Sequence, residues 1–143
     1  MNGNGATILT IPDSPSTPQN VPAQTTGTQI TFTWSAGASN GGSSVLDYKI
    51  MYDEGRGDSV YTTLDTQEVG PSYTATLLTA GTTYSFKVYA RNAQGYSLGS
   101  SPSSILAAQI PDTPSAPTTT IQGNFVKIAW TAPSAQGSPI TSY

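Results

Sequence analysis

The stretch LTAGTTYSFKVYARNAQG, residues 78–95, decides the fold of this chain. In its second half an apolar or aromatic side chain occupies every other position, at Tyr84, Phe86, Val88 and Ala90. Because successive side chains of a β-strand point to opposite faces, this period of two predicts a strand with one buried face. The glycines of TAGTT and NAQG predict a turn before the strand and another after it.

The same period of two occurs in ITFTW, residues 30–34, and in YKIMY, residues 48–52. Clusters of Gly and Pro separate the runs, and no segment keeps a helical period. We therefore predict an all-β fold, a two-sheet antiparallel sandwich. The aromatic residues share the inward phase, which favours a packed core over an aromatic platform for sugars. The predicted structural core consists of Trp34, Tyr48, Ile50, Tyr52, Leu78, Tyr84, Phe86 and Val88.

These segments resemble the fibronectin type III family. The resemblance includes Pro15 and Pro18 before the first strand, Trp34 in the second and YKIMY in the third, and it is strongest in residues 78–95. It covers residues 14–110 completely and 111–143 in part, and it implies an immunoglobulin-like sandwich. It also implies that Tyr84 is a corner tyrosine, whose hydroxyl bonds the backbone near Leu78. Ala80 departs from the family, which often has Pro there.

The sequence repeats itself. IPDSPSTP, residues 11–18, returns as IPDTPSAP, residues 110–117, and ITFTWSAGASNGGSSVLDY, residues 30–48, returns as VKIAWTAPSAQGSPITSY, residues 126–143. Such self-similarity is typical of tandem arrays. We expect residues 1–11 to be the tail of a preceding repeat, 12–110 a complete domain, and 111–143 the first strands of a following repeat. We expect later residues of a longer chain to complete that repeat, or crystal or assembly contacts to shield it, in preference to strand addition by another copy.

The amino-acid composition argues against several classes of function. The 143 residues contain no Cys and no His, 9% are charged, and the net charge is −3. A chain with few basic residues does not suit nucleic acid, and the missing His argues against an ordinary enzyme. We expect no cofactor, no bound metal and no membrane span. Ser and Thr supply most of the polar surface, which favours an extracellular or cell-surface location.

One short motif is a candidate adhesion loop. Arg56, Gly57 and Asp58 form the tripeptide that cell-surface integrins recognise in several adhesive proteins. In fibronectin's adhesive module the tripeptide lies in the loop between the sixth and seventh strands. That loop corresponds here to residues 92–101. The tripeptide of this chain instead follows the third strand, where Gly55 and Gly57 suit a tight turn. We therefore interpret the motif as a turn and keep adhesion as the alternative.

Acidic residues concentrate around this loop, which could indicate a calcium site. DEGRGD lacks the regular spacing of oxygen ligands that a calcium loop needs. We interpret the cluster as a solvated sheet edge, where charge discourages pairing with other sheets. Its six members are Asp47, Asp53, Glu54, Asp58, Asp65 and Glu68.

The predicted function is that of a noncatalytic structural or adhesive module in a tandem-repeat extracellular protein, acting as a spacer or a protein-interaction surface. Its expected partners are neighbouring repeats of the same chain, other copies in a fibre, or a cell-surface receptor. Two alternatives stay open: an accessory module of a large secreted hydrolase or carbohydrate-binding protein, and an intracellular titin-like scaffold.

Overall fold

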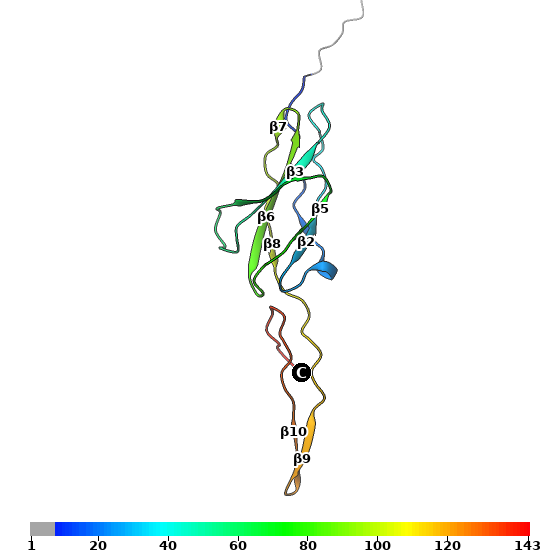
Figure 1. The fold of residues 1–143 in the computed structure, drawn as a ribbon, viewed down its shortest axis with the longest axis vertical. Helices are drawn as coiled ribbons and strands as arrows, with labels where there is room; N and C mark the ends of the chain where they lie inside the picture. The colour runs from blue at the N-terminus through cyan, green and yellow to red at the C-terminus, as the bar shows by residue number, and fades with distance from the viewer. Residues whose placement is uncertain (1–7) are drawn as a thin grey trace, which may run out of the picture.

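The computed structural model describes residues 8–143. Its regular elements are strands, apart from the short 3₁₀ helix η1 (Pro22–Gln24). Figure 1 shows a compact body with a narrow hairpin extending from one end. Within the described residues, no helix has the length and apolar character needed to cross a membrane. The strands are β1 (Gln19–Asn20), β2 (Ile30–Thr33), β3 (Asp47–Tyr52), β4 (Thr62–Glu68), β5 (Ser72–Ala75), β6 (Thr83–Asn92), β7 (Gly95–Tyr96), β8 (Ser103–Leu106), β9 (Thr118–Gln122) and β10 (Phe125–Ala129).

The body consists of two antiparallel sheets. One sheet has the order β1-β2-β5, and the other has β4-β3-β6 with β7 and β8 both paired to β6. The two sheets meet where the rings of Phe32 on β2 and Phe86 on β6 lie 4.7 Å apart between centroids. The predicted all-β fold, a two-sheet antiparallel sandwich, is thereby confirmed.

The core is built from the inward positions of β2, β3 and β6. Ile50 pairs with Val88, and each of the two side chains is fully buried. Full burial of one such aliphatic side chain contributes about 1.5–3 kcal/mol. Of the eight core residues named from the sequence, all but Tyr52 are buried. Tyr52 is half-buried because it ends β3, where its ring stacks on Tyr84 and Phe86 at the rim of the core.

Trp34 lies one residue beyond β2, so the expectation that it belongs to this strand is wrong by one position. Its backbone N–H donates to the carbonyl of Pro71 at 2.9 Å, which keeps Trp34 close to the sheet. The indole packs edge-on against Tyr48, with 5.3 Å between centroids, and is 5% exposed. Its buried Nε1 has no hydrogen-bond partner among residues 8–143, which subtracts from the stability that its burial provides.

Tyr84 occupies the corner that leads into β6. Its hydroxyl oxygen accepts a hydrogen bond of 2.9 Å from the backbone N–H of Thr79. Leu78 donates its own N–H to the carbonyl of Thr28 at 3.0 Å, which ties the corner to the segment that leads into β2. The predicted bond from the tyrosine hydroxyl to the backbone near Leu78 is therefore confirmed.

After the body, β9 and β10 form a hairpin whose register matches that of β1 and β2. Thr118 pairs with Ala129 as Gln19 pairs with Thr33. The pairing of β9 and β10 continues to a tight turn at Gly123, whereas η1 interrupts the corresponding part of the body. The hairpin is exposed throughout, since no described strand packs against its apolar face.

The core predicts the effect of two substitutions at Trp34. Trp34→Ala should lower the free energy of unfolding by about 3–5 kcal/mol, because it removes a buried ring and leaves a cavity. Trp34→Phe should lower it by only about 1–2 kcal/mol, because it keeps an aromatic ring against Tyr48 and removes the unpaired N–H. Urea melts of the full chain, followed by circular dichroism, measure both. A loss below about 1 kcal/mol for Trp34→Ala would show that this ring does not carry the core.

Candidate interaction loop

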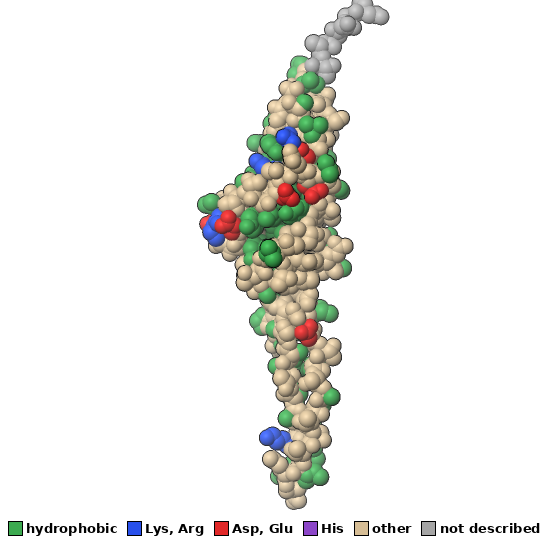
Figure 2. Space-filling model, viewed as in Figure 1, with side chains coloured by type: hydrophobic (Ala, Val, Ile, Leu, Met, Phe, Trp, Pro, Cys, Tyr) green, Lys and Arg blue, Asp and Glu red, His purple; other side chains and the backbone are tan. Residues whose placement is uncertain are grey.

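The loop between β3 and β4, residues 53–61, projects sideways from the sandwich (Figure 1). It contains the tripeptide Arg56-Gly57-Asp58, which the structure places after the third strand, as the sequence indicated. Figure 2 shows basic and acidic side chains gathered over the body and few on the narrow lower part of the molecule. Within the loop, three acidic residues, Asp53, Glu54 and Asp58, accompany one basic residue, Arg56.

Asp53 organises the base of this loop. It follows β3 directly, and it is 2% exposed. Its Oδ1 accepts the backbone N–H groups of Gly55 and Ser85, each at 2.9 Å, and its Oδ2 accepts that of Gly57 at 3.1 Å. Since Ser85 lies on β6, one carboxylate both shapes the loop and fixes it to the neighbouring strand of the same sheet. Three N–H donors satisfy this buried charge, which would otherwise be costly.

Two glycines let the chain turn around Asp53. Gly55 has a φ of 73° and Gly57 a φ of 70°, values that favour glycine. A Cβ on Gly55 would lie 2.6 Å from the Thr82 side chain, whereas a Cβ on Gly57 would meet nothing within 4 Å. The prediction that these glycines suit a tight turn is confirmed.

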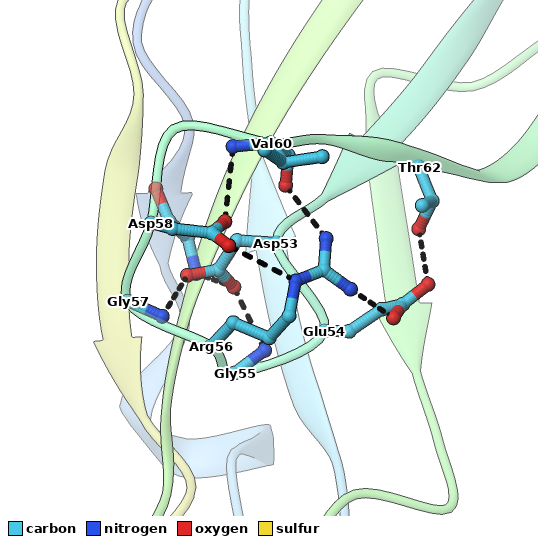
Figure 3. A network of polar contacts seen from close by, with 9 residues as sticks. Asp53, Glu54, Gly55, Arg56, Gly57, Asp58, Val60 and Thr62 are labelled. Carbon is cyan, nitrogen blue, oxygen red and sulfur yellow. Dashed lines mark hydrogen bonds and ion pairs between the residues drawn. The ribbon is translucent and has the colours of Figure 1, made fainter.

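The guanidinium of Arg56 is held by its own loop (Figure 3). Its Nε donates to Asp58 Oδ2 at 3.2 Å, its Nη2 donates to the carbonyl of Val60 at 2.9 Å, and its Nη1 pairs with Glu54. Glu54 also accepts the hydroxyl of Thr62 at 2.7 Å. Desolvation lowers the pKa of Arg56, but the hydrogen bond to Asp58 and the charges of Glu54 and Asp58 outweigh it, so the pKa lies above its ordinary value.

The two charged members of the tripeptide therefore face each other. Their side chains are 35% and 44% exposed, so a partner can reach both. A receptor that bound Arg56 and Asp58 separately would have to replace the contact between them. Exposed ion pairs of this kind contribute about 0–1 kcal/mol, so the ion pair between Arg56 and Asp58 stabilises the loop only weakly. Asp53, rather than the tripeptide, gives the loop its shape.

Asp47 is the second buried carboxylate that the sequence analysis placed at a solvated edge. It pairs with Arg91 across β3 and β6, where Nε donates to Oδ1 at 2.9 Å and Nη2 contacts Oδ2. The hydrogen bond to Asp47 raises the pKa of Arg91.

The solvated-edge interpretation is therefore wrong for Asp47 and Asp53, because β6 supplies each with N–H donors. Asp65 and Glu68, on β4, are partly exposed, as are Glu54 and Asp58 in the loop. In residues 8–143, no group of three or more acidic side chains is arranged to hold a metal ion.

The outer face of the β3–β6 sheet carries contacts that the sequence analysis missed. The ammonium of Lys49 lies 4.6 Å from the ring centre of Tyr89 and 4.5 Å from that of Tyr96, and that of Lys87 lies 4.3 Å from the ring centre of Tyr61. Cation–π contacts at exposed sites contribute about 0.5–1 kcal/mol each. The alternation of Lys and Tyr on paired strands was the available signal, but recognising it requires the strand register.

Comparisons with known proteins agree with this geometry. The sequence profile of the fibronectin type III domain matches residues 16–106. A crystal structure of titin domains aligns with 68% of this chain and 32% of its own length, with 24% identity and a TM-score of 0.61. The twitchin kinase region from C. elegans aligns with 68% of this chain and 17% of its own length, with 26% identity and a TM-score of 0.60.

A solution structure of a human FNIII domain aligns with 79% of this chain and 92% of its own length, with 18% identity and a TM-score of 0.63. The chain thus spans less than two thirds of the titin and twitchin structures and nearly all of the human domain. At these identities, the likenesses to titin and to the human domain show the fold alone.

The loop predicts unequal effects for its two aspartates. Asp53→Asn should lower the free energy of unfolding by about 1–3 kcal/mol, because the new amide group would oppose one of three buried N–H donors. Asp58→Asn, the matched control, should cost less than about 1 kcal/mol, because its contacts are exposed. Urea unfolding of both variants provides the comparison. Equal losses would contradict the assignment of Asp53 as the organising residue.

If the Arg-Gly-Asp tripeptide serves only as a turn, we expect that integrins do not recognise it. Cells that bear integrins should adhere equally poorly to surfaces coated with the wild-type chain and with Asp58→Glu, because the loop that Asp53 shapes holds Arg56 and Asp58 facing each other rather than apart. Counting attached cells on both surfaces, beside a short linear Arg-Gly-Asp peptide as positive control, is the measurement. Selective attachment to the wild-type protein would overturn the turn interpretation.

Proposed function

Because its residues 16–106 match the family profile, the chain belongs to the fibronectin type III family, and we propose that it is a noncatalytic module that spaces and connects its neighbours in a tandem-repeat extracellular protein. The family occurs in many proteins with different roles, so the proposal must rest on features of this chain.

The observation that carries the proposal is a recurring aromatic pair. In the body, Trp34 packs on Tyr48 with ring planes at 71° and centroids 5.3 Å apart. Beyond the body, Trp130 packs on Tyr143 with ring planes at 63° and centroids 5.7 Å apart. The pairing register of β1 and β2 also recurs in β9 and β10. The body and residues 111–143 are therefore similar in local structure as well as in sequence. This supports residues 111–143 as the start of a second copy.

The proposed boundaries follow from this recurrence. Residues 12–110 form the complete domain, and 111–143 supply the first strands of the next repeat. Residues 1–11 are proposed as the tail of a preceding repeat, of which residues 1–7 lie outside the described part.

An exposed apolar face on the second copy supports the same proposal. Ile128 and Trp130 are 57% and 52% exposed, whereas their counterparts Phe32 and Trp34 are buried in the body. In the body, the sheet containing β6 covers these positions. We propose that the corresponding strands of the second copy cover Ile128 and Trp130 in the native protein. Burial of such surface is the main favourable contribution to folding.

Two features favour a spacer over a catalytic or a receptor-binding role. The six acidic groups between positions 47 and 68 are engaged in the loop, in the ion pair with Arg91 or in local backbone hydrogen bonds, where they have structural roles. The polar surface is rich in Ser and Thr and poor in charge, which suits an extracellular module. An accessory module of a secreted enzyme, or an intracellular scaffold, would use the same spacing property in another setting.

Stretching single molecules of the native protein tests the tandem arrangement. The repeat period of 96 to 99 residues, at about 3.3–3.6 Å per extended residue, predicts unfolding events that each lengthen the chain by roughly 300 Å. Several equal events per molecule are expected. A single event, or increments without a common length, would count against a tandem array.

A further inference from the structure

We propose that consecutive repeats dock through a joint of small residues, in which the loop 134–138 of the following copy sits against the corner 79–82 of the complete domain. This inference rests on the proposed tandem arrangement and adds to it the surface through which one repeat holds the next. The joint would set the angle between consecutive repeats, so that their relative orientation in the array is fixed rather than variable.

Backbone hydrogen bonds first tie the linker to the following loop. The N–H of Gln109 donates to the carbonyl of Gln136 at 3.0 Å, and that of Asp112 donates to the carbonyl of Ser134 at 3.1 Å. The Gln136 side chain adds a further contact, since its Nε2 donates to the carboxylate oxygens of Asp112 at 3.1 and 3.0 Å. The loop therefore has a defined position relative to the segment that leaves the complete domain.

Glycines then bring two backbones into contact. A Cβ on Gly137 would lie 2.5 Å from the carbonyl oxygen of Ala107 and 2.9 Å from the backbone nitrogen of Gly81. From the other side, a Cβ on Gly81 would lie 3.2 Å from the carbonyl oxygen of Gly137. Because the contacted atoms belong to backbone, they cannot move aside as a flexible side chain would. The fit of the loop on the corner therefore requires glycine at position 137.

The same loop exists at the opposite end of the complete domain. The N–H of Thr10 donates to the carbonyl of Gly41 at 2.9 Å, and that of Asp13 donates to the carbonyl of Ser39 at 2.9 Å. These donors precede Gln109 and Asp112 by 99 positions each, and the acceptors precede Gln136 and Ser134 by 95 positions each. One pattern of linker-to-loop bonds thus occurs twice.

The dihedral angles repeat together with the hydrogen bonds. Gly41 has a φ of 71° where Gln136 has 49°, and Gly42 has a φ of 79° where Gly137 has 93°.

Asn92 also fixes this loop, because it donates its side-chain N–H groups to the carbonyls of Thr10 and Asn40, each at 2.8 Å. The loop 39–42 is therefore held in the shape that the loop 134–138 uses against Gly81. We expect the loop 39–42 to contact the corner of a preceding repeat, with a glycine at the position of Gly81.

The joint explains how modules with so little charge could hold a fixed orientation. Interfaces between domains of one chain are usually small enough to permit relative motion. Here, direct backbone contact at two glycines and a hydrogen-bonded linker restrict the motion without a large apolar interface. Adding one methyl group at Gly137 should separate the two units.

Gly137→Ala in the full chain tests the joint, with Gly123→Ala as the matched control. Both glycines have a positive φ, of 93° and 61°, but a Cβ on Gly123 would meet nothing within 4 Å. In the wild-type chain, NMR should show a nuclear Overhauser contact between Gly137 and the amide of Gly81, and relaxation of the body and the hairpin should give one common tumbling time. Gly137→Ala should abolish the contact, shift the Gly81 amide resonance and let the hairpin tumble faster. Gly123→Ala should do none of these.

Two results would overturn the proposal: a wild-type chain without the contact between Gly137 and Gly81, or equal effects of the two variants. Contacts between Thr118 and Ala129 distinguish failure of the joint from failure of the tandem arrangement, because they report the second copy by itself. If those contacts persist while the joint contact is absent, the second copy stands and the joint does not. If both are absent, the joint is excluded and the tandem proposal loses its structural support.

Discussion

The contact between Phe32 and Phe86 is the constraint on which the rest of the structure depends. It joins the two sheets at the centre of a chain that contains no cysteine and so relies on apolar burial to hold them together. To make this contact, β2 and β6 must present one face inward, which sets the period of two along both strands. Trp34 and Tyr73 then extend the same aromatic cluster around Phe32.

Strand β6 links this core to the surface loop and to the segment that follows the body. Its inward side chains fill the core, while the N–H of Ser85 holds Asp53 and the guanidinium of Arg91 holds Asp47. The corner before it carries Tyr84, and the same corner contains Gly81, against which Gly137 of the loop 134–138 lies. The conspicuous tripeptide lies at the end of this scaffold, so its shape follows from the fold.

The sequence predicted the main strands and the core because these depend on local period, and the resemblance to the fibronectin type III family implied the corner tyrosine. It did not predict that Asp47 and Asp53 are buried, since their partners on β6 lie 44 and 32 positions away and only the strand register brings them together. Composition alone suggested a solvated acidic edge. The glycine contact between Gly81 and Gly137 was also hidden, because a glycine in a turn and a glycine in a joint look the same in a sequence.

The central claim is that residues 111–143 begin a second copy of the domain, and the solvent exposure of Trp130 in the native protein tests it most directly. In the described residues, Trp130 is 52% exposed and its counterpart Trp34 is 5% exposed. Hydroxyl-radical footprinting of the native protein, read by mass spectrometry, measures both side chains in one sample. The account predicts that Trp130 is oxidised as slowly as Trp34, because the remaining strands of its own repeat cover it. Rapid oxidation of Trp130 beside a protected Trp34 would contradict the account.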